Sequence, residues 1–396
     1  MNIAILCFGI SSIANVSGTE KVFVDMANHF VKNNNIVYSI WNDKPGIKPY
    51  YDFDPRVRQI NLELGKIKAP IYYKIYRELA KGLHINAVNY VDQYKTKQLS
   101  NALLKKVDVD SLDLIICYEF NSIMVANSVS QKKIPIIAMC HNSIENQVES
   151  LTPLQRKEVS KVDVFQVLMP SFIPKAKKLL NTEICSIPNV IPQVALENIE
   201  NLAQSKESYR IVFLGRINKE QKRPLIAVKT FLNIVARFPK WHLDIYGPVV
   251  EKEYMQEIDD YIKKYDKGQQ VKYKGIVKNA AEALKNADIF VFPSAYEGFG
   301  LALGEANAMG IPAVGFSYAP AVGDLIENGK NGFLADTEED FQNKLEELMV
   351  NQPLRCQMGK NAWLSMRAYS PEKVWGQWDQ LVEQVLQKKG KLNENI

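Results

Sequence analysis

The stretch DIFVFPSAYEGFGLALGEANAMGIPAV, residues 288–314, contains the pattern that decides the fold. Its apolar run 289–292 predicts a buried strand. The run of helix formers 301–309 predicts a helix that ends at Gly310 and Pro312, and a second apolar run follows. A strand, a turn, a helix and a further strand in this order predict a unit of a parallel α/β sheet.

The turn between this strand and this helix has the composition of an anion site. Gly298 and Gly300 allow the backbone to approach a ligand, and the N–H groups at the start of the helix can bind a phosphate. Glu297 and Glu305, with seven residues between them, flank the turn, and carboxylates accept hydrogen bonds from hydroxyl groups. The pattern indicates a ligand with phosphate in the middle and polyols at both ends, such as a nucleotide sugar. An ordinary strand–helix turn with two solvent-facing glutamates is the alternative interpretation.

The composition is that of a soluble globular protein. The chain has 396 residues, 46% hydrophobic and 23% charged, which is enough for two domains. A net charge of +5 is too small to indicate nucleic-acid binding by itself. The five scattered cysteines favour reduced thiols in a cytoplasmic protein over disulfides or a zinc site. No apolar run has the length of a membrane-spanning helix, and the first residues lack the pattern of a signal peptide.

Repeated strand–helix units indicate two domains. The chain opens with a strand–loop–helix–strand pattern without G-x-G-x-x-G, and a second series of units begins at 211–215. We expect a Rossmann-like N-terminal domain over 1–190, completed by a C-terminal helix in 371–396, and a Rossmann-like C-terminal domain over 206–370.

Basic residues are concentrated in two segments, 66–97 and 151–180. The first of them also contains five tyrosines. One interpretation is an amphipathic surface that faces a membrane or an acceptor. The other is a solvated helical face that covers the core.

Further residues accompany the opening stretch: Gly215-Arg216, Lys222, Gly247, Gly275-Ile276-Val277 and Gly310-Ile311-Pro312. Together with the E-x7-E pair, this set resembles the donor domain of the retaining GT-B glycosyltransferases of the group 1, or family 4, type, which make bacterial polysaccharides and lipopolysaccharides. The resemblance covers essentially the whole chain and is specific over 210–315. It implies two doubly wound α/β domains that face each other across a cleft, and a C-terminal helix that crosses back to the N-terminal domain.

One position departs from the family pattern. The family commonly has a lysine five residues after the arginine, whereas this chain has Gln221 at that position and Lys222 immediately after it. A loop that is longer by one residue can still present Lys222. Lys219 is a second candidate for the same role.

The resemblance implies roles for the site residues. Arg216 and Lys222 would neutralise the donor diphosphate, whose charge grows as it leaves. Glu297 would bind hydroxyls of the transferred sugar and Glu305 the ribose diol. His141, after a predicted strand, would face the donor sugar and acceptor, or would simply cap the strand end. The other donor-binding positions are Gly18, Gly215, Val277, Gly298, Phe299, Gly300 and Leu301.

The function implied is transfer of a hexose or N-acetylhexosamine from a nucleotide sugar, expected to be a UDP-sugar, to a glycan or lipid-linked acceptor with retention of configuration. Expected partners are the nucleotide sugar, the acceptor and an anionic membrane surface on the inner face of the cytoplasmic membrane, without nucleic acid. The alternatives are an epimerase, phosphorylase or hydrolase on the same fold, or a non-catalytic nucleotide-sugar-binding subunit.

No cofactor or metal ion is expected. Two D-x-D pairs, Asp52-Phe53-Asp54 and Asp108-Val109-Asp110, are of the kind that metal-dependent glycosyltransferases of the other major fold use for a divalent ion. Both lie in polar segments that do not close a clear apolar strand, and Arg216 and Lys222 already supply cations.

Overall fold

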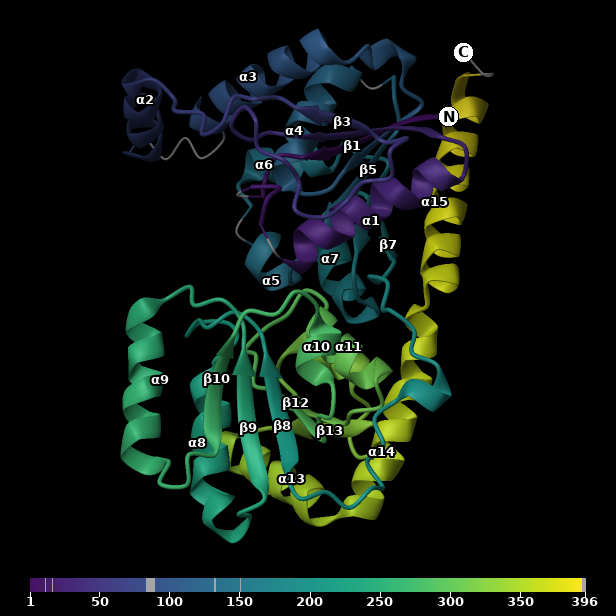
Figure 1. Ribbon diagram of the computed structural model, residues 1–396. Helices are drawn as coiled ribbons and strands as arrows, with labels where there is room; N and C mark the ends of the chain where they lie inside the picture. Colours follow the sequence, from purple (N-terminus) through teal and green to yellow (C-terminus); the bar gives the residue numbers. More distant parts are fainter. Residues whose placement is uncertain (11, 16, 83–89, 132, 150, 394–396) are drawn as a thin grey trace. The chain divides into compact units, whose positions relative to one another are not determined.

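The computed structural model describes residues 1–393 except 11, 16, 83–89, 132 and 150. The chain forms two compact units, each built on one parallel sheet (Figure 1). Unit 1 comprises Met1–Ile187 and Trp375–Ile396, and unit 2 comprises Pro188–Val374. The expected fold class, two Rossmann-like α/β domains and a long C-terminal helix, is confirmed.

Unit 1 has a seven-stranded sheet in the order β3-β2-β1-β4-β5-β6-β7. Its strands are β1 (Asn2–Cys7), β2 (Ile36–Trp41), β3 (Arg58–Asn61), β4 (Leu114–Cys117), β5 (Ile136–Cys140), β6 (Val164–Val167) and β7 (Glu183–Ser186). Its helices are α1 (Gly18–Lys32), α2 (Ile71–Gly82), α3 (Tyr90–Lys106), α4 (Phe120–Ser130), α5 (Ile144–Gln147), α6 (Pro153–Val159) and α7 (Ile173–Leu179). The strand order reverses between β1 and β4, and ligands of open α/β sheets bind beyond the carboxyl ends of the strands at such a point.

The C-terminal helix α15 (Pro371–Asn393) packs on unit 1 from Trp375 onwards. The Trp375 ring stacks on His29 of α1 with the ring centroids 4.6 Å apart, and His29 Nε2 lies 2.9 Å from Asp379 Oδ1. Trp378 and Val382 of the same helix are buried. The apolar face at the end of the sequence therefore contributes to the core of unit 1.

Helix α2 exposes an apolar face instead of covering the core. Five large side chains on it are about half exposed or more: Ile71, Tyr72, Ile75, Tyr76 and Leu79. The spacing of four residues within this set places them along one side of the helix. The core-covering interpretation of the 66–97 segment is therefore wrong for these five residues.

Unit 2 has a six-stranded sheet in the order β10-β9-β8-β11-β12-β13. Its strands are β8 (Tyr209–Leu214), β9 (Trp241–Tyr246), β10 (Val271–Gly275), β11 (Ile289–Phe292), β12 (Ala313–Phe316) and β13 (Gly332–Ala335). Its helices are α8 (Pro224–Ile234), α9 (Lys252–Tyr265), α10 (Ala280–Leu284), α11 (Leu301–Ala308), α12 (Pro320–Leu325), α13 (Glu338–Val350) and α14 (Gln352–Ser365). Strand β11 is buried throughout, and the strand order reverses between β8 and β11.

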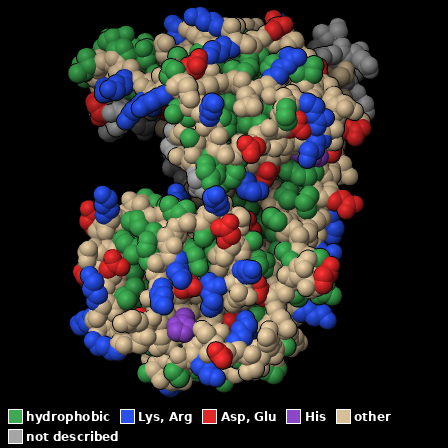
Figure 2. Space-filling model, viewed as in Figure 1, with side chains coloured by type: hydrophobic (Ala, Val, Ile, Leu, Met, Phe, Trp, Pro, Cys, Tyr) green, Lys and Arg blue, Asp and Glu red, His purple; other side chains and the backbone are tan. Residues whose placement is uncertain are grey.

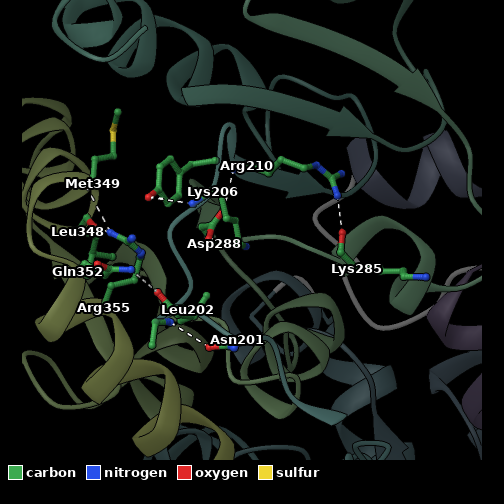
Figure 3. A network of polar contacts seen from close by, with 12 residues as sticks. Asn201, Leu202, Lys206, Arg210, Lys285, Asp288, Leu348, Met349, Gln352 and Arg355 are labelled. Carbon is green, nitrogen blue, oxygen red and sulfur yellow. Dashed lines mark hydrogen bonds and ion pairs between the residues drawn. The ribbon is translucent and has the colours of Figure 1, made fainter. Parts of the chain in front are cut away.

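The amino ends of β8 and β11 are joined by a network of polar contacts (Figure 3). Asp288 is fully buried, pairs with Lys206 Nζ at 2.8 Å, and accepts a hydrogen bond from the Arg210 backbone N–H at 2.8 Å. In the same network Arg355 of α14 is buried and donates to the carbonyl oxygen of Leu348 at 2.5 Å. Arg355 also lies 5.5 and 5.2 Å from the ring centroids of Tyr209 and Trp241, so these contacts hold the segment before β8 and helix α14 at the amino ends of the strands.

Among the described residues, no helix is long and apolar enough to cross a membrane.

Replacing Asp288 with Ala should lower the free energy of unfolding by about 3–5 kcal/mol, because it leaves the Lys206 ammonium group without its anion and the Arg210 N–H without its acceptor. Chemical denaturation measures this change. Glu327→Ala is the control, because Glu327 pairs with Lys330 at 2.7 Å and both side chains are more than 60% exposed. It should change stability by less than about 1 kcal/mol. Equal losses in the two variants would contradict the structural role of Asp288.

Candidate active site

Two loops meet at the carboxyl edge of the unit 2 sheet, where the strand order reverses. One follows β8 and contains Arg216 and Lys222; the other follows β11 and contains Glu297. Because β8 and β11 are hydrogen-bonded neighbours in the sheet, the two loops leave it side by side. The fold thereby brings together residues that are 75 positions apart in the sequence.

The closest contact between the loops is an ion pair. Lys222 Nζ lies 2.5 Å from Glu297 Oε1, and the side chains are only 13% and 6% exposed. The Lys222 ammonium group also lies 4.8 Å from the centroid of the Phe292 ring, at the end of β11. Low exposure strengthens the attraction between the charges and makes each of them costly to leave unpaired.

The structure distinguishes the two candidate lysines. Lys219 is 61% exposed and pairs with Glu257 of α9 at 2.9 Å. Lys222 instead contacts Glu297, and the Asn218 side chain accepts a hydrogen bond from the Lys222 backbone N–H at 3.1 Å. The loop therefore places Lys222, and not Lys219, beside Glu297.

Arg216 is exposed, and one of its nitrogens is held by a neighbour in the same loop. Arg216 Nη2 donates to Gln221 Oε1 at 2.8 Å. The sequence prediction did not include Gln221, since a glutamine at the family's lysine position indicates only a departure from the pattern. Its contacts to the second loop become visible only in the folded structure.

Glycines allow the strand ends to approach each other. Gly247, after β9, has φ +138°, and a Cβ atom there would lie 1.9 Å from the carbonyl oxygen of Gly215, after β8. Gly247 N–H donates to the carbonyl oxygen of Gly275 at 2.9 Å. A Cβ atom on Gly215 itself would lie 3.4 Å from the Lys222 side chain. A larger residue at 247 would therefore force the ends of β8 and β9 apart.

Helix α11 begins at this edge. Its N-cap, Gly300, has φ +91°, a left-handed conformation that favours glycine. Gly298 and Phe299 are buried in the turn before it, and Phe299 packs edge-on against Tyr369 with centroids 5.6 Å apart. The N–H groups of the first helical turn, beginning with Leu301, have no partner within a helix, and a glycine N-cap supplies no side-chain acceptor. This end of α11 can accept an anion.

The remaining positions of unit 2 that were predicted to bind the donor lie on adjacent elements. Glu305 is partly buried on α11, and Val277 is partly buried in the loop between β10 and α10. Both follow carboxyl ends of strands in the same sheet, those of β11 and β10.

His141 and Gly18 belong to unit 1, and Tyr118 connects them. His141 follows β5 and stacks on the Tyr118 ring, with the centroids 3.9 Å apart, while the Tyr118 hydroxyl donates to the carbonyl oxygen of Thr19 at 2.6 Å. Gly18 is the first residue of α1, next to Thr19. His141 therefore packs against Tyr118 at the carboxyl edge of the unit 1 sheet.

The environment of His141 keeps its imidazole neutral. Part of the residue is exposed, but Nε2 is buried and has no hydrogen-bond partner among the described residues. Burial lowers the pKa of His141 to about 3, from an ordinary 6.5. The imidazole binds a proton near pH 6.5 in the unfolded chain but only near pH 3 in the native protein. The free energy of unfolding therefore decreases as pH falls from 6.5 towards 3, and this group does not change it above pH 6.5.

A partly buried carboxylate of unit 1 was missed by the sequence prediction. Glu119 follows β4 and accepts hydrogen bonds from Phe8 N–H at 2.8 Å and Asn121 N–H at 2.6 Å. Burial raises its pKa in spite of these bonds. A glutamate after a strand and before a helix was its only sequence signal, and Glu119 serves as the N-cap of α4.

The D-x-D pairs have other contacts. Asp54 forms a two-point pair with Arg56, at 2.9 and 2.8 Å, and this partner lowers the Asp54 pKa to about 2. Asp110 lies in a short 3-10 helix over Val109–Ser111. Within the described part of the chain, no three His, Cys, Asp or Glu residues are grouped in a way that could hold a metal ion.

Known proteins resemble this chain in sequence. The family model described as glycosyl transferases group 1 matches residues 195–364, which contain all of the unit 2 site residues above. An uncharacterized glycosyltransferase of Haemophilus influenzae is 24% identical over 94% of this chain and 98% of the relative. The amylovoran biosynthesis glycosyltransferase AmsD of Erwinia amylovora is 23% identical, with the same coverage.

Solved structures share the fold. A sucrose-phosphate synthase from Thermosynechococcus elongatus matches with a TM-score of 0.76 at 15% identity, over 98% of this chain and 99% of the other. The pneumococcal O-GlcNAc transferase GtfA, solved with UDP and GlcNAc, matches with a TM-score of 0.73 at 17% identity, over 98% and 99%. These likenesses and the family match agree with the two parallel sheets and the loops at their carboxyl edges. Residues 195–364 match the glycosyl transferases group 1 model, and the chain has the GT-B fold of two parallel α/β units that these glycosyltransferase structures share.

Proposed function

We propose that the chain transfers a hexose or N-acetylhexosamine from a UDP-sugar to a glycan or lipid-linked acceptor with retention of configuration, in surface polysaccharide or lipopolysaccharide synthesis. The observation that carries the proposal is the buried Lys222–Glu297 pair at the point where the strand order of unit 2 reverses. The names of relatives support the class of donor and product: a UDP-N-acetylglucosamine–peptide transferase subunit of Streptococcus pneumoniae and a poly(ribitol-phosphate) α-N-acetylglucosaminyltransferase of Staphylococcus aureus.

Charge stabilisation is the main chemical contribution of unit 2 in this proposal. When the bond between sugar and diphosphate breaks, negative charge grows on the leaving phosphate oxygens. Arg216, Lys222 and the first-turn N–H groups of α11 converge on one edge of the sheet and would stabilise that charge. We therefore propose that leaving-group departure requires no metal ion.

The two carboxylates would divide the hydroxyl groups of the donor. Glu297 would accept hydrogen bonds from the transferred sugar and Glu305 from the ribose. Glu297 compensates the Lys222 charge. A diphosphate would offer Lys222 a second anion and leave Glu297 oxygens available to hydroxyl donors.

We assign the acceptor to unit 1 and the donor to unit 2. His141 would contribute as a neutral imidazole, because its low pKa leaves it uncharged at any pH near neutrality. A neutral imidazole has one donor and one acceptor nitrogen, which suits contact with sugar hydroxyls. The acceptor hydroxyl would attack from the face from which the diphosphate leaves, which retains configuration, and its proton would pass to the departing phosphate oxygen.

Lys222→Ala should reduce kcat for transfer about 10²–10³-fold, because it removes a preorganised cation from the developing phosphate charge. The assay measures release of UDP from UDP-glucose, UDP-galactose and UDP-N-acetylglucosamine, with and without a lipid-linked glycan acceptor. NMR of the product reports the anomeric configuration.

Lys219→Ala is the matched control for this prediction. Lys219 lies in the same loop as Lys222, but its side chain is exposed and pairs with Glu257. Its activity should stay within twofold of the wild type. Equal losses in both variants, or an inverted product, would contradict the proposal. Turnover of the donor at the same rate with and without the acceptor would instead support an epimerase or hydrolase.

We also propose that unit 1 binds the inner face of an anionic cytoplasmic membrane through α2. The exposed apolar face of this helix includes two tyrosines, which suit the interface between headgroups and acyl chains. Exposed lysines adjoin it: Lys66, Lys68 and Lys74. Residues 66–81 contain five basic residues and one acidic residue. Figure 2 shows apolar and basic side chains side by side over this part of unit 1.

Flotation with vesicles tests the membrane surface. Wild type should float with phosphatidylcholine vesicles that contain phosphatidylglycerol at low salt, and less at high salt. The double variant Ile75→Glu/Leu79→Glu should lose most of this binding. Val350→Glu is the control, since Val350 is 66% exposed on α13 of unit 2 and should leave flotation unchanged. Absence of wild-type binding at low salt, or full binding by the double variant, would overturn this part of the proposal.

A further inference from the structure

Gln221 forms hydrogen bonds to both loops of the candidate active site. Its side chain is buried, with 8% of the residue exposed. The amide oxygen accepts from Arg216 Nη2 at 2.8 Å, and the amide nitrogen donates to the carbonyl oxygen of Tyr296 at 3.3 Å. Its backbone carbonyl oxygen accepts from Ala295 N–H at 2.8 Å. Gln221 therefore connects the Arg216 guanidinium group to the residue that immediately precedes Glu297.

The two residues after Gln221 bind the same turn. Lys222 pairs with Glu297, and Arg223 Nε donates to the carbonyl oxygen of Pro293 at 2.9 Å. Arg223 has φ +48°, a left-handed conformation unusual for a residue with a side chain. Three consecutive residues thus fasten the β8 loop to residues 293–297. Such a multiple attachment fixes the distance between the cationic and the anionic side of the site.

We propose that Gln221 is a positioning residue for sugar transfer: it holds Arg216 in one orientation and sets the position of the turn that carries Glu297. The inference rests on the proposed function. An amide suits the task because it accepts and donates while carrying no charge, which leaves the positive charge of Arg216 available to a diphosphate. A lysine at 221 could not accept from Arg216, and a carboxylate there would compete with the phosphates.

The test uses UDP as the probe, with affinity measured by calorimetry and donor KM and kcat by turnover. Gln221→Met keeps the length of the side chain but removes its hydrogen bonds, and should weaken UDP binding about tenfold. Gln221→Glu should weaken it further, with an effect that shrinks as salt rises. In an Arg216→Ala background, Gln221→Met should change UDP affinity less than twofold, because its effect acts through Arg216.

Gln270→Met is the matched control for a purely structural effect. Gln270 is 9% exposed and donates to the carbonyl oxygen of Trp241 at 2.7 Å, near the amino ends of β9 and β10. This variant should lose stability but keep UDP affinity within twofold of the wild type.

Two results would overturn the inference while the proposed function stands: an equal loss of UDP affinity for Gln221→Met with and without Arg216, or an equal loss for Gln270→Met. Wild-type protein that binds no UDP would overturn the inference together with the choice of donor.

Discussion

The pairing of Lys222 with Glu297 is the interaction on which the account of unit 2 depends. An ammonium group and a carboxylate that are this little exposed lose much of their hydration, and each compensates the charge of the other. The arrangement keeps a cation and an anion within a site that is expected to receive a diphosphate and a polyol. Its position depends on two loops that leave neighbouring parallel strands, so the sheet order determines the chemistry available at its edge.

Glycine contacts and hydrogen bonds fix the positions of the two loops that carry Lys222 and Glu297. Gly247 allows the end of β9 to approach the end of β8, and Gly215 leaves room for the Lys222 side chain. Gln221 and Arg223 bind the backbone of the turn before Glu297. Far from this edge, Asp288 fixes the amino end of β11 through buried contacts to Lys206 and Arg210. Polar contacts therefore fix the loop that follows β11, and the Asp288–Lys206 ion pair fixes the opposite end of the same strand.

Sequence alone was sufficient where hydrophobic periodicity and glycine determine the structure. The strands at 36–41 and 289–292 and the long C-terminal helix are confirmed, because continuous apolar runs and a clear amphipathic face leave few alternatives. Strand β3, with the sequence RQIN, was missed because its polar side chains give no alternating pattern. The same limit applies to β7, which begins with a glutamate.

Contacts between distant segments could not be predicted from the sequence. Lys219 and Lys222 were equivalent candidates until the folded loop placed one on Glu257 and the other on Glu297. The role of Gln221 depends on a turn more than 70 residues later in the chain. Helix α2 shows the opposite difficulty: its pattern was compatible with a core-covering face, and only the packing showed that this face is exposed. The roles of the predicted site residues towards a ligand stay predictions.

A crystal structure of the protein with UDP tests the central claim most directly. The account predicts the diphosphate at the carboxyl edge of the unit 2 sheet, with its oxygens within hydrogen-bond distance of Lys222 Nζ, the Arg216 guanidinium group and the first-turn N–H groups of α11. A diphosphate bound elsewhere, or bound at this edge without contact to Lys222 or Arg216, would contradict it.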